Sequence, residues 1–188
     1  MINNLTIVNV VASTFVKSTI DIEKLAMIPK QVNYEPEVFP GLIYRRQNPK
    51  ATVIMFASGK ITSVGTKSEN HARKAIRTTV EEIKKLGGLM GSCKLNPINI
   101  ENVVGTLDLR LSIDLDELAL ILPNALYETE QFPGLIYRPS SSNEVVLVFA
   151  SGKLVATGAK SEIRVKQLLK EVYETISRAE SVIDRNRP

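Results

Sequence analysis

Apolar and polar residues alternate along the chain with two different periods, one typical of strands and one of helices. Residues 5–15 are β-branched and apolar, as strands prefer. Residues 21–28 carry apolar side chains at helical spacing and stop at a proline, which predicts a short helix. Three strand-like segments follow at about 42–47, 52–57 and 60–65. A Ser-Gly pair between the last two predicts a tight hairpin turn.

A longer helix is predicted after these strands. Ser68 is a suitable N-cap, and Gly87-Gly88 ends the helical pattern. The side chains expected on its buried face are Ala72, Ala75, Ile76, Thr79, Val80, Ile83 and Leu86.

The same succession of elements occurs twice. Phe-Pro-Gly-Leu-Ile-Tyr-Arg stands at 39–45 and at 132–138, an offset of 132 − 39 = 93. Phe-Ala-Ser-Gly-Lys recurs at the same offset, at 56–60 and 149–153. Residues 8–83 align with their counterparts without a gap, so the chain is an internal duplication. Functional residues are therefore expected in pairs offset by 93.

The repeat predicts the domain organisation and the fold class. Residues 1–93 form the first repeat with a linker from about residue 87, residues 94–178 form the second, and 179–188 form a polar tail expected to fray. Connections of hairpin length favour an antiparallel sheet with helices on one face, an α+β fold. The second long helix should bury Val165, Leu168, Leu169, Val172 and Ile176.

The predicted sheet has two apolar faces. Thr52, Ile54 and Phe56 point to one side of their strand, and Val53 and Met55 point to the other. A half-buried antiparallel strand would instead alternate apolar with polar residues. Helices can cover one face only, so the second face either packs against a further sheet or partner, or is an open binding surface.

Two features favour a binding surface. Asn9 and Asn102 stand in mid-strand on that second face. Hydroxyl and basic side chains flank it in both repeats. An apolar centre with amide groups and a cationic rim suits a flat ligand with polar edges and anionic margins, as a nucleic-acid groove is.

Composition sets the remaining bounds. The chain has 188 residues, 44% hydrophobic and 23% charged, which is typical of a folded protein. The net charge of 24 − 20 = +4 permits an anionic partner. A single cysteine, Cys93, and a single histidine, His71, exclude multi-cysteine and two-histidine metal sites. The sequence also has no phosphate-binding loop of the GxxxxGK type, and its carboxylate pairs stand in predicted loops or helix starts, so we expect no cofactor and no enzyme. No apolar run is long enough for a membrane helix, and no secretory signal is expected.

These repeated motifs closely resemble the TATA-box-binding protein family over about residues 5–178. The resemblance implies a saddle, in which two pseudo-symmetric repeats form one curved antiparallel β-sheet with helices on the convex face. It also implies a general transcription initiation factor that binds and sharply bends TATA-box promoter DNA through the minor groove, then recruits transcription factor B and RNA polymerase. The alternative is a paralogous minor-groove DNA-binding protein with altered specificity or no polymerase recruitment.

The resemblance assigns roles to individual residues. The side chains that wedge between base steps would be Phe39, Phe56, Phe132 and Phe149. Contacts to base edges in the minor groove would come from Asn9, Asn102, Val11, Val104, Ile54, Leu147, Thr62, Val64, Val155 and Thr157. Phosphate contacts would come from Arg45, Arg138, Ser58, Ser151, Lys60, Lys153, Lys67 and Lys160.

Partners and location follow from the same resemblance. Transcription factor B would bind the loop that carries Glu128, Glu130 and Gln131. The charges of the two halves differ, because residues 1–93 carry 13 − 7 = +6 and residues 94–188 carry 11 − 13 = −2. The difference is either ordinary surface variation or a division of labour, in which acidic residues of the second half meet basic groups on the partner. A homodimer is a further option for the protein without DNA. The high similarity of the repeats and the short N-terminus are typical of archaeal members, which predicts the cytoplasm, in the nucleoid; a eukaryotic protein would be nuclear.

The first repeat departs from the family pattern at one strand. The second repeat reads Val155-Ala156-Thr157-Gly158, as the family usually does, whereas the first reads Thr62-Ser63-Val64-Gly65. The order of polar and apolar side chains on the proposed binding face is therefore swapped. Val64 cannot make the hydrogen bond expected of threonine, so we predict reduced discrimination in the half-site under residues 62–64.

Overall fold

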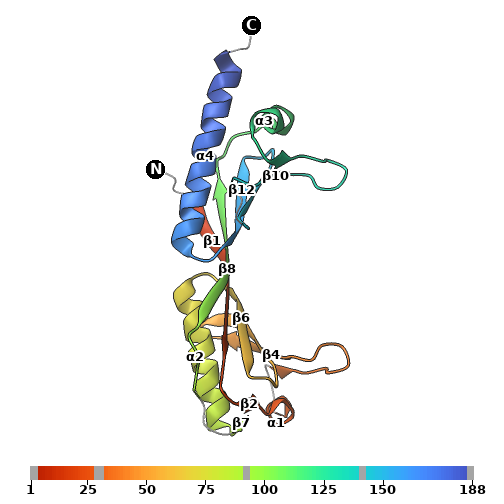
Figure 1. The fold of residues 1–188 in the computed structure, drawn as a ribbon, viewed down its shortest axis with the longest axis vertical. Helices are drawn as coiled ribbons and strands as arrows, with labels where there is room; N and C mark the ends of the chain where they lie inside the picture. The colour runs from red at the N-terminus through yellow and green to blue at the C-terminus, as the bar shows by residue number, and fades with distance from the viewer. Residues whose placement is uncertain (1–3, 28–31, 91–93, 140–142, 186–188) are drawn as a thin grey trace. The chain divides into compact units, whose positions relative to one another are not determined.

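The computed structural model describes residues 4–27, 32–90, 94–139 and 143–185 (Figure 1). Contacts divide the chain into two compact units, each corresponding to one repeat. One unit comprises Asn9–Glu101, and the other comprises Met1–Val8 together with Asn102–Pro188. The sequence placed the division near residue 93, whereas the contacts group the first eight residues with the second repeat.

The first repeat has five strands in the order β3-β4-β5-β6-β1, all antiparallel where their pairing is resolved. The strands are β1 (Leu5–Phe15), β3 (Val32–Asn33), β4 (Leu42–Gln47), β5 (Lys50–Met55) and β6 (Lys60–Thr66). Its helices are α1 (Ile22–Ala26) and α2 (Glu69–Lys85). A small separate ribbon pairs β2 (Thr19–Ile20) with β7 (Leu89–Met90).

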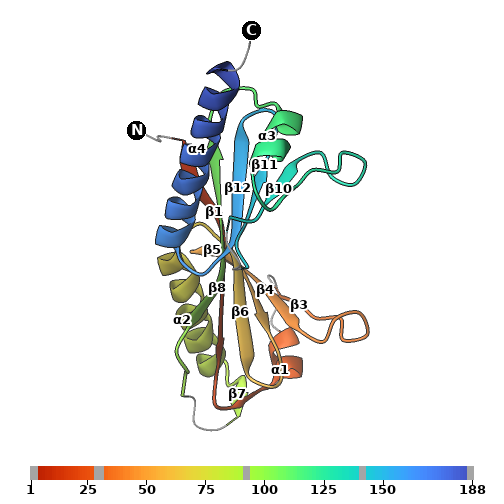
Figure 2. The ribbon, with the colours of Figure 1, turned by 45° about the horizontal axis from the view of Figure 1, so that its top comes forward.

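The second repeat has the same plan, with the strand order β8-β12-β11-β10-β9 (Figure 2). The strands are β8 (Asn99–Asp108), β9 (Ala125–Leu126), β10 (Leu135–Tyr137), β11 (Val145–Val148) and β12 (Lys153–Ala159). Its helices are α3 (Leu115–Ile121) and α4 (Glu162–Arg185). The predicted α+β fold, with antiparallel strands and helices in each repeat, is confirmed.

The long helices form where the apolar stripes predict them. The Ser68 hydroxyl caps α2 by accepting a hydrogen bond from the backbone N–H of His71 at 3.2 Å. Every residue of the predicted stripes of α2 and α4 is buried except Leu86, which is 48% exposed because it follows the last helical residue. Helix α4 continues to Arg185, beyond residue 178 where a polar tail was expected.

The two faces of the sheet differ in burial in each repeat. In β5, Val53 and Met55 lie under α2 and are at most 2% exposed. Thr52, Ile54 and Phe56 point to the opposite face and stay only partly buried. The long helices α2 and α4 pack on the other face, against β5, β6 and β12, which leaves the face of Thr52, Ile54 and Phe56 and its counterpart in the second repeat as an apolar surface open to a ligand. We call it the open face of each repeat.

Each helix is fastened to its sheet by an ion pair that has no counterpart in the other repeat. In the first repeat the buried Arg46 guanidinium donates to the carboxylate of Glu82, with Nη2 3.0 Å from Oε1. In the second repeat Arg164 donates to Glu144 at 2.6 Å. Position 139, the mate of Arg46, is a proline. The duplicated halves have thus diverged on their helix side.

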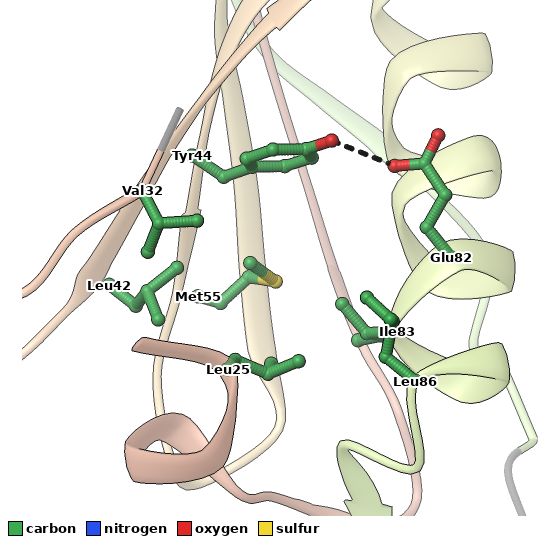
Figure 3. Close-up of a pocket in the computed structure, with 8 residues that line it drawn as sticks. All are labelled: Leu25, Val32, Leu42, Tyr44, Met55, Glu82, Ile83 and Leu86. Atoms are coloured by element: carbon green, nitrogen blue, oxygen red, sulfur yellow. Dashed lines mark hydrogen bonds between the residues drawn. The ribbon is translucent and has the colours of Figure 1, made fainter. Parts of the chain in front are cut away.

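The first repeat also holds a small apolar cavity between α1, β4 and α2, of about 50 Å³ (Figure 3). Tyr44 points across its rim, and its hydroxyl donates to Glu82 at 3.1 Å. Burial, followed by the nearby Glu82 carboxylate, raises the pKa of the Tyr44 hydroxyl above its usual 10.0. The remaining lining is Leu25, Val32, Leu42, Met55, Ile83 and Leu86.

One buried hydroxyl on the helix side is unpaired within the part of the chain that the structure describes. Ser63 is fully buried and its Oγ has no hydrogen-bond partner there, whereas its mate in the second repeat is the equally buried Ala156. Because a buried unpaired hydroxyl costs free energy, Ser63→Ala should raise the free energy of unfolding by about 1 kcal/mol. Urea unfolding measures this, with Ala156→Ser as the reverse control expected to destabilise. Loss of stability in Ser63→Ala would contradict the prediction.

Within the described residues, no helix is both long and apolar enough to span a membrane. The same part of the chain holds no group of three or more histidine, cysteine or acidic residues that could bind a metal ion. Cys93 lies outside the described residues.

Candidate functional site

Two aromatic pairs occupy the open faces, one in each repeat. The ring centroids of Phe39 and Phe56 are 5.8 Å apart with an interplanar angle of 66°. Those of Phe132 and Phe149 are 5.8 Å apart at 62°. Phe39 is 37% exposed and the other three rings are partly buried. The edge-to-face contact steadies each pair while leaving ring surface for a ligand.

A glycine seats each pair against the sheet. A Cβ atom on Gly41 would lie 2.6 Å from Cε1 of Phe39 and 3.0 Å from Cε1 of Phe56. On Gly134 it would lie 2.9 Å from Cε1 of Phe132. All three distances are below ordinary van der Waals contact, so only glycine lets the rings lie this close to the backbone. The Phe-Pro-Gly motif therefore places its own phenylalanine.

A bulge in the strand beside each asparagine fixes the amide. Pairing slips beside Gly65 and Gly158, whose positive φ values of 86° and 90° favour glycine. The backbone N–H of Gly65 donates to Oδ1 of Asn9 at 2.8 Å, and that of Gly158 donates to Oδ1 of Asn102 at 2.8 Å. Because each amide oxygen accepts a protein hydrogen bond, donation to a ligand is left to the NH₂ group, which at Asn102 already uses one of its two N–H bonds toward Oγ1 of Thr157 at 3.1 Å.

Apolar side chains surround the amides on the open faces. Val11 and Ile54 lie on the face of Asn9, and Val104, Leu147 and Val155 lie on the face of Asn102, all partly buried. Strand register sets Ile54 beside Thr62 and sets Leu147 beside Val155. Each repeat therefore presents an apolar surface that contains one fixed amide.

Cationic and hydroxyl side chains are exposed around both open faces. Ser58 and Lys60 follow Phe56 through a turn, and Ser151 and Lys153 follow Phe149 in the same way. In the described part of the chain, none of the six cations of this set forms an ion pair within 4.0 Å. They are available to an anionic ligand. These cations are Arg45, Lys60, Lys67, Arg138, Lys153 and Lys160.

Known proteins with the same two-repeat plan match this chain. The family model described as transcription factor TFIID, or TATA-binding protein, matches residues 4–86 and 97–179. The TATA-box-binding protein of Methanocaldococcus jannaschii is 43% identical over 94% of this chain and 95% of its own length. That of Thermococcus sibiricus is 42% identical over 89% of this chain and 92% of its own. The solved structure of the Methanococcus jannaschii protein superposes with a TM-score of 0.77, at 43% identity, covering 93% of this chain and 99% of that one.

The chain belongs to the TATA-binding protein family.

The loop predicted to bind a partner has the same turn in both repeats of this family member. The backbone N–H of Phe132 donates to the carbonyl of Glu128 at 2.9 Å, and that of Phe39 donates to the carbonyl of Glu35 at 2.8 Å. Glu128, Glu130 and Gln131 are all exposed. The turn that delivers the phenylalanine to the open face thus also displays the acidic side chains.

Two features of the site in this TATA-binding family member were not predicted. One is the hydrogen bond from each bulge glycine to its asparagine; a glycine inside a strand is the signal that could have indicated it. The other is Thr52, which lies opposite Val64, whereas in the second repeat Val145 lies opposite Thr157. Threonine and valine are exchanged across the strand pair.

Proposed function

We propose that this chain is a general transcription initiation factor that binds TATA-box promoter DNA in the minor groove, bends it, and recruits transcription factor B and RNA polymerase. The observation that carries the proposal is an open apolar face in each repeat that holds one aromatic pair and one amide with at least one N–H bond left to donate. Each relative named above is called a TATA-box-binding protein.

The aromatic pairs would open the base stack. A partly exposed ring that enters a base step replaces lost base–base contact with ring contact, and opening the step costs a few kcal/mol, as is documented for minor-groove binders including this family. Flexible TA steps are the least costly to open. Two pairs, one in each repeat, would kink the duplex at two places.

The amides would give preference for A·T pairs. The minor groove of A·T pairs presents only the acceptors adenine N3 and thymine O2, which suit the NH₂ groups of Asn9 and Asn102. A G·C pair adds the N2 amino group of guanine, a donor that would face other donors and apolar side chains. The preference therefore comes from an apolar surface with fixed donors.

The exposed cations would hold the phosphates. They position the duplex without reading its sequence, and each phosphate contact makes binding more sensitive to salt. Since the family and the relatives named above are described by DNA binding, we propose no catalytic role and no cofactor. Its relatives named above are archaeal, so we propose the nucleoid as its place of action.

Binding and bending of labelled duplexes test the proposal. A duplex with a TATA element should bind more tightly than one in which G·C pairs replace it, and should bend on binding, measured by energy transfer between its ends. A steep salt dependence without preference for A·T pairs would contradict the proposal and favour the paralogous, nonspecific binder. The exchange of threonine and valine at positions 62 and 64 is the observation that supports the paralogous binder as a second candidate.

Recruitment of transcription factor B is tested by charge reversal. Glu128 and Glu130 are exposed in the loop before Phe132, where they would meet basic groups of the partner. Glu128→Lys with Glu130→Lys should weaken the ternary complex at least tenfold and leave binary DNA binding unchanged, measured by mobility shift with and without transcription factor B. Glu35→Lys with Glu37→Lys, in the matching loop of the first repeat, is the control. Equal losses in the binary and ternary complexes would refute this role.

A further inference from the structure

The open faces of the two repeats carry different hydroxyl patterns. In the first repeat one row across the strands reads Ser13, Thr62, Ile54. The matching row of the second repeat reads Thr106, Val155, Leu147. The outer members are alike in kind, a hydroxyl at one end and an aliphatic side chain at the other. Only the middle position changes from a hydroxyl to a methyl-bearing side chain of the same shape.

The Thr62 hydroxyl is available to a ligand. Thr62 is partly buried on the open face, and its Oγ1 has no hydrogen-bond partner among the described residues. Its neighbour Ser13 differs, because the Ser13 hydroxyl donates to Oε1 of Glu101 at 2.6 Å. Thr106, at the matching place in the second repeat, shares a hydrogen bond with Thr6 at 3.0 Å. The free hydroxyl at position 62 is therefore the difference between the two rows.

The amides also differ in how firmly they are held. Nδ2 of Asn102 donates to Oγ1 of Thr157 at 3.1 Å, in addition to the bond from Gly158 to its oxygen. Among the described residues the Asn9 side chain has only the bond from Gly65, because Val64 stands where a threonine hydroxyl would be. The first repeat thus lacks a hydroxyl beside its amide and has a free one at Thr62, two residues earlier on the strand.

We propose that the first repeat tolerates a guanine at the base pair that Thr62 reaches, whereas the second repeat rejects guanine at the matching pair because Val155 stands there. The proposal rests on the proposed function and names the specificity of the same face. The two half-sites would then be read unequally, which would favour one orientation of the protein on a nearly palindromic element.

The chemistry of the minor-groove edge carries the inference. The guanine N2 amino group needs an acceptor when it is removed from water, and a threonine hydroxyl can accept while a valine cannot. Against Val155 that donor would be left unsatisfied, which weakens binding about tenfold or more. A hydroxyl can also donate to adenine N3 or thymine O2, so Thr62 keeps A·T pairs acceptable. Tolerance of guanine therefore costs the first repeat no A·T binding.

Scanning a TATA duplex with one modified base at a time tests this. Replacing single adenines by 2,6-diaminopurine adds an amino group to the minor groove and retains pairing with thymine. Competition binding followed by fluorescence anisotropy should show one tolerant position in one half of the element and a penalty of about tenfold at its mirror position. Scans with true G·C pairs should give the same pattern.

Two isosteric variants assign the tolerance to a residue. Thr62→Val should remove the tolerant position, and Val155→Thr should create one at the mirror position. Combining both changes should move the tolerance to the other half. Thermal unfolding of each variant checks that it is folded, since both changes lie on the open face and keep the side-chain shape.

The outcomes separate this inference from the proposed function. Equal penalties in both halves for the wild type, or a Thr62→Val profile identical to the wild type, would overturn the inference while A·T binding stands. Failure of the wild type to prefer the unmodified TATA duplex over a G·C duplex would overturn the proposed function itself. Val64→Thr, which restores the hydroxyl beside Asn9, should sharpen discrimination at a different base pair and leave the tolerant position in place.

Discussion

Phe149→Ala is expected to abolish the sharp bend in a TATA duplex and to weaken binding about 100-fold. The wedge that keeps an opened base step filled would be gone, and a loss of a few kcal/mol corresponds to that factor. Phe149 lies on the open face with its ring against Phe132 and is only partly buried. Phe56→Ala should have the same effect through the first repeat. Bending is measured by energy transfer and affinity by anisotropy.

The fold should survive these substitutions. Each ring contributes an edge-to-face contact of about 1 kcal/mol to stability, while the core on the helix side is untouched. Phe15→Ala is the matched control, because Phe15 is 45% exposed and belongs to neither aromatic pair. It should bend DNA like the wild type. Wild-type bending by both Phe149→Ala and Phe56→Ala would refute the role of the pairs and, with it, the main support for the proposed function.

The sequence predicted the parts of the molecule that depend on local pattern. Apolar spacing located both long helices, and the duplication transferred each assignment to the other repeat. The open face was inferred from strand alternation in both repeats; in one of these strands Ile54 and Met55 point to opposite sides and both are apolar. Burial in the structure agrees, because Met55 is 2% exposed under α2 and Ile54 is only partly buried.

Local sequence pattern could not predict contacts between residues that are distant in the chain. The bond from Gly65 to Asn9 joins residues 56 positions apart and depends on a bulge that shifts the strand register. The ion pair of Arg46 with Glu82 joins residues 36 apart. This ion pair has no counterpart in the second repeat, where a proline replaces Arg46, so the duplication could not indicate it. The grouping of the first eight residues with the second repeat likewise depends on pairing that no local period reveals.

Glu82→Gln is expected to lower the free energy of unfolding of the first repeat by about 2 kcal/mol at neutral pH. Arg46, whose side chain is 7% exposed, would lose its charged partner while remaining buried. Removing one member of a fully buried pair costs more, but the Glu82 side chain is 41% exposed, and solvent reduces the loss. Glutamine keeps the size and an acceptor oxygen, so packing beside Tyr44 is retained. Urea unfolding measures the change.

The pH dependence identifies the carboxylate as the cause. Hydrogen bonds from Arg46 lower the pKa of Glu82 below its ordinary 4.5, so the folded state binds a proton less readily than the unfolded state. The stabilisation is therefore complete above that ordinary value and is lost as the pH falls through the lowered one. The wild type should lose its advantage over Glu82→Gln in acid, and Glu81→Gln, on the exposed side of α2, should match the wild type at neutral pH. If the wild type stays more stable than Glu82→Gln by the same amount at pH values where Glu82 is protonated in both the folded and the unfolded state, the ion pair is not the source of the difference.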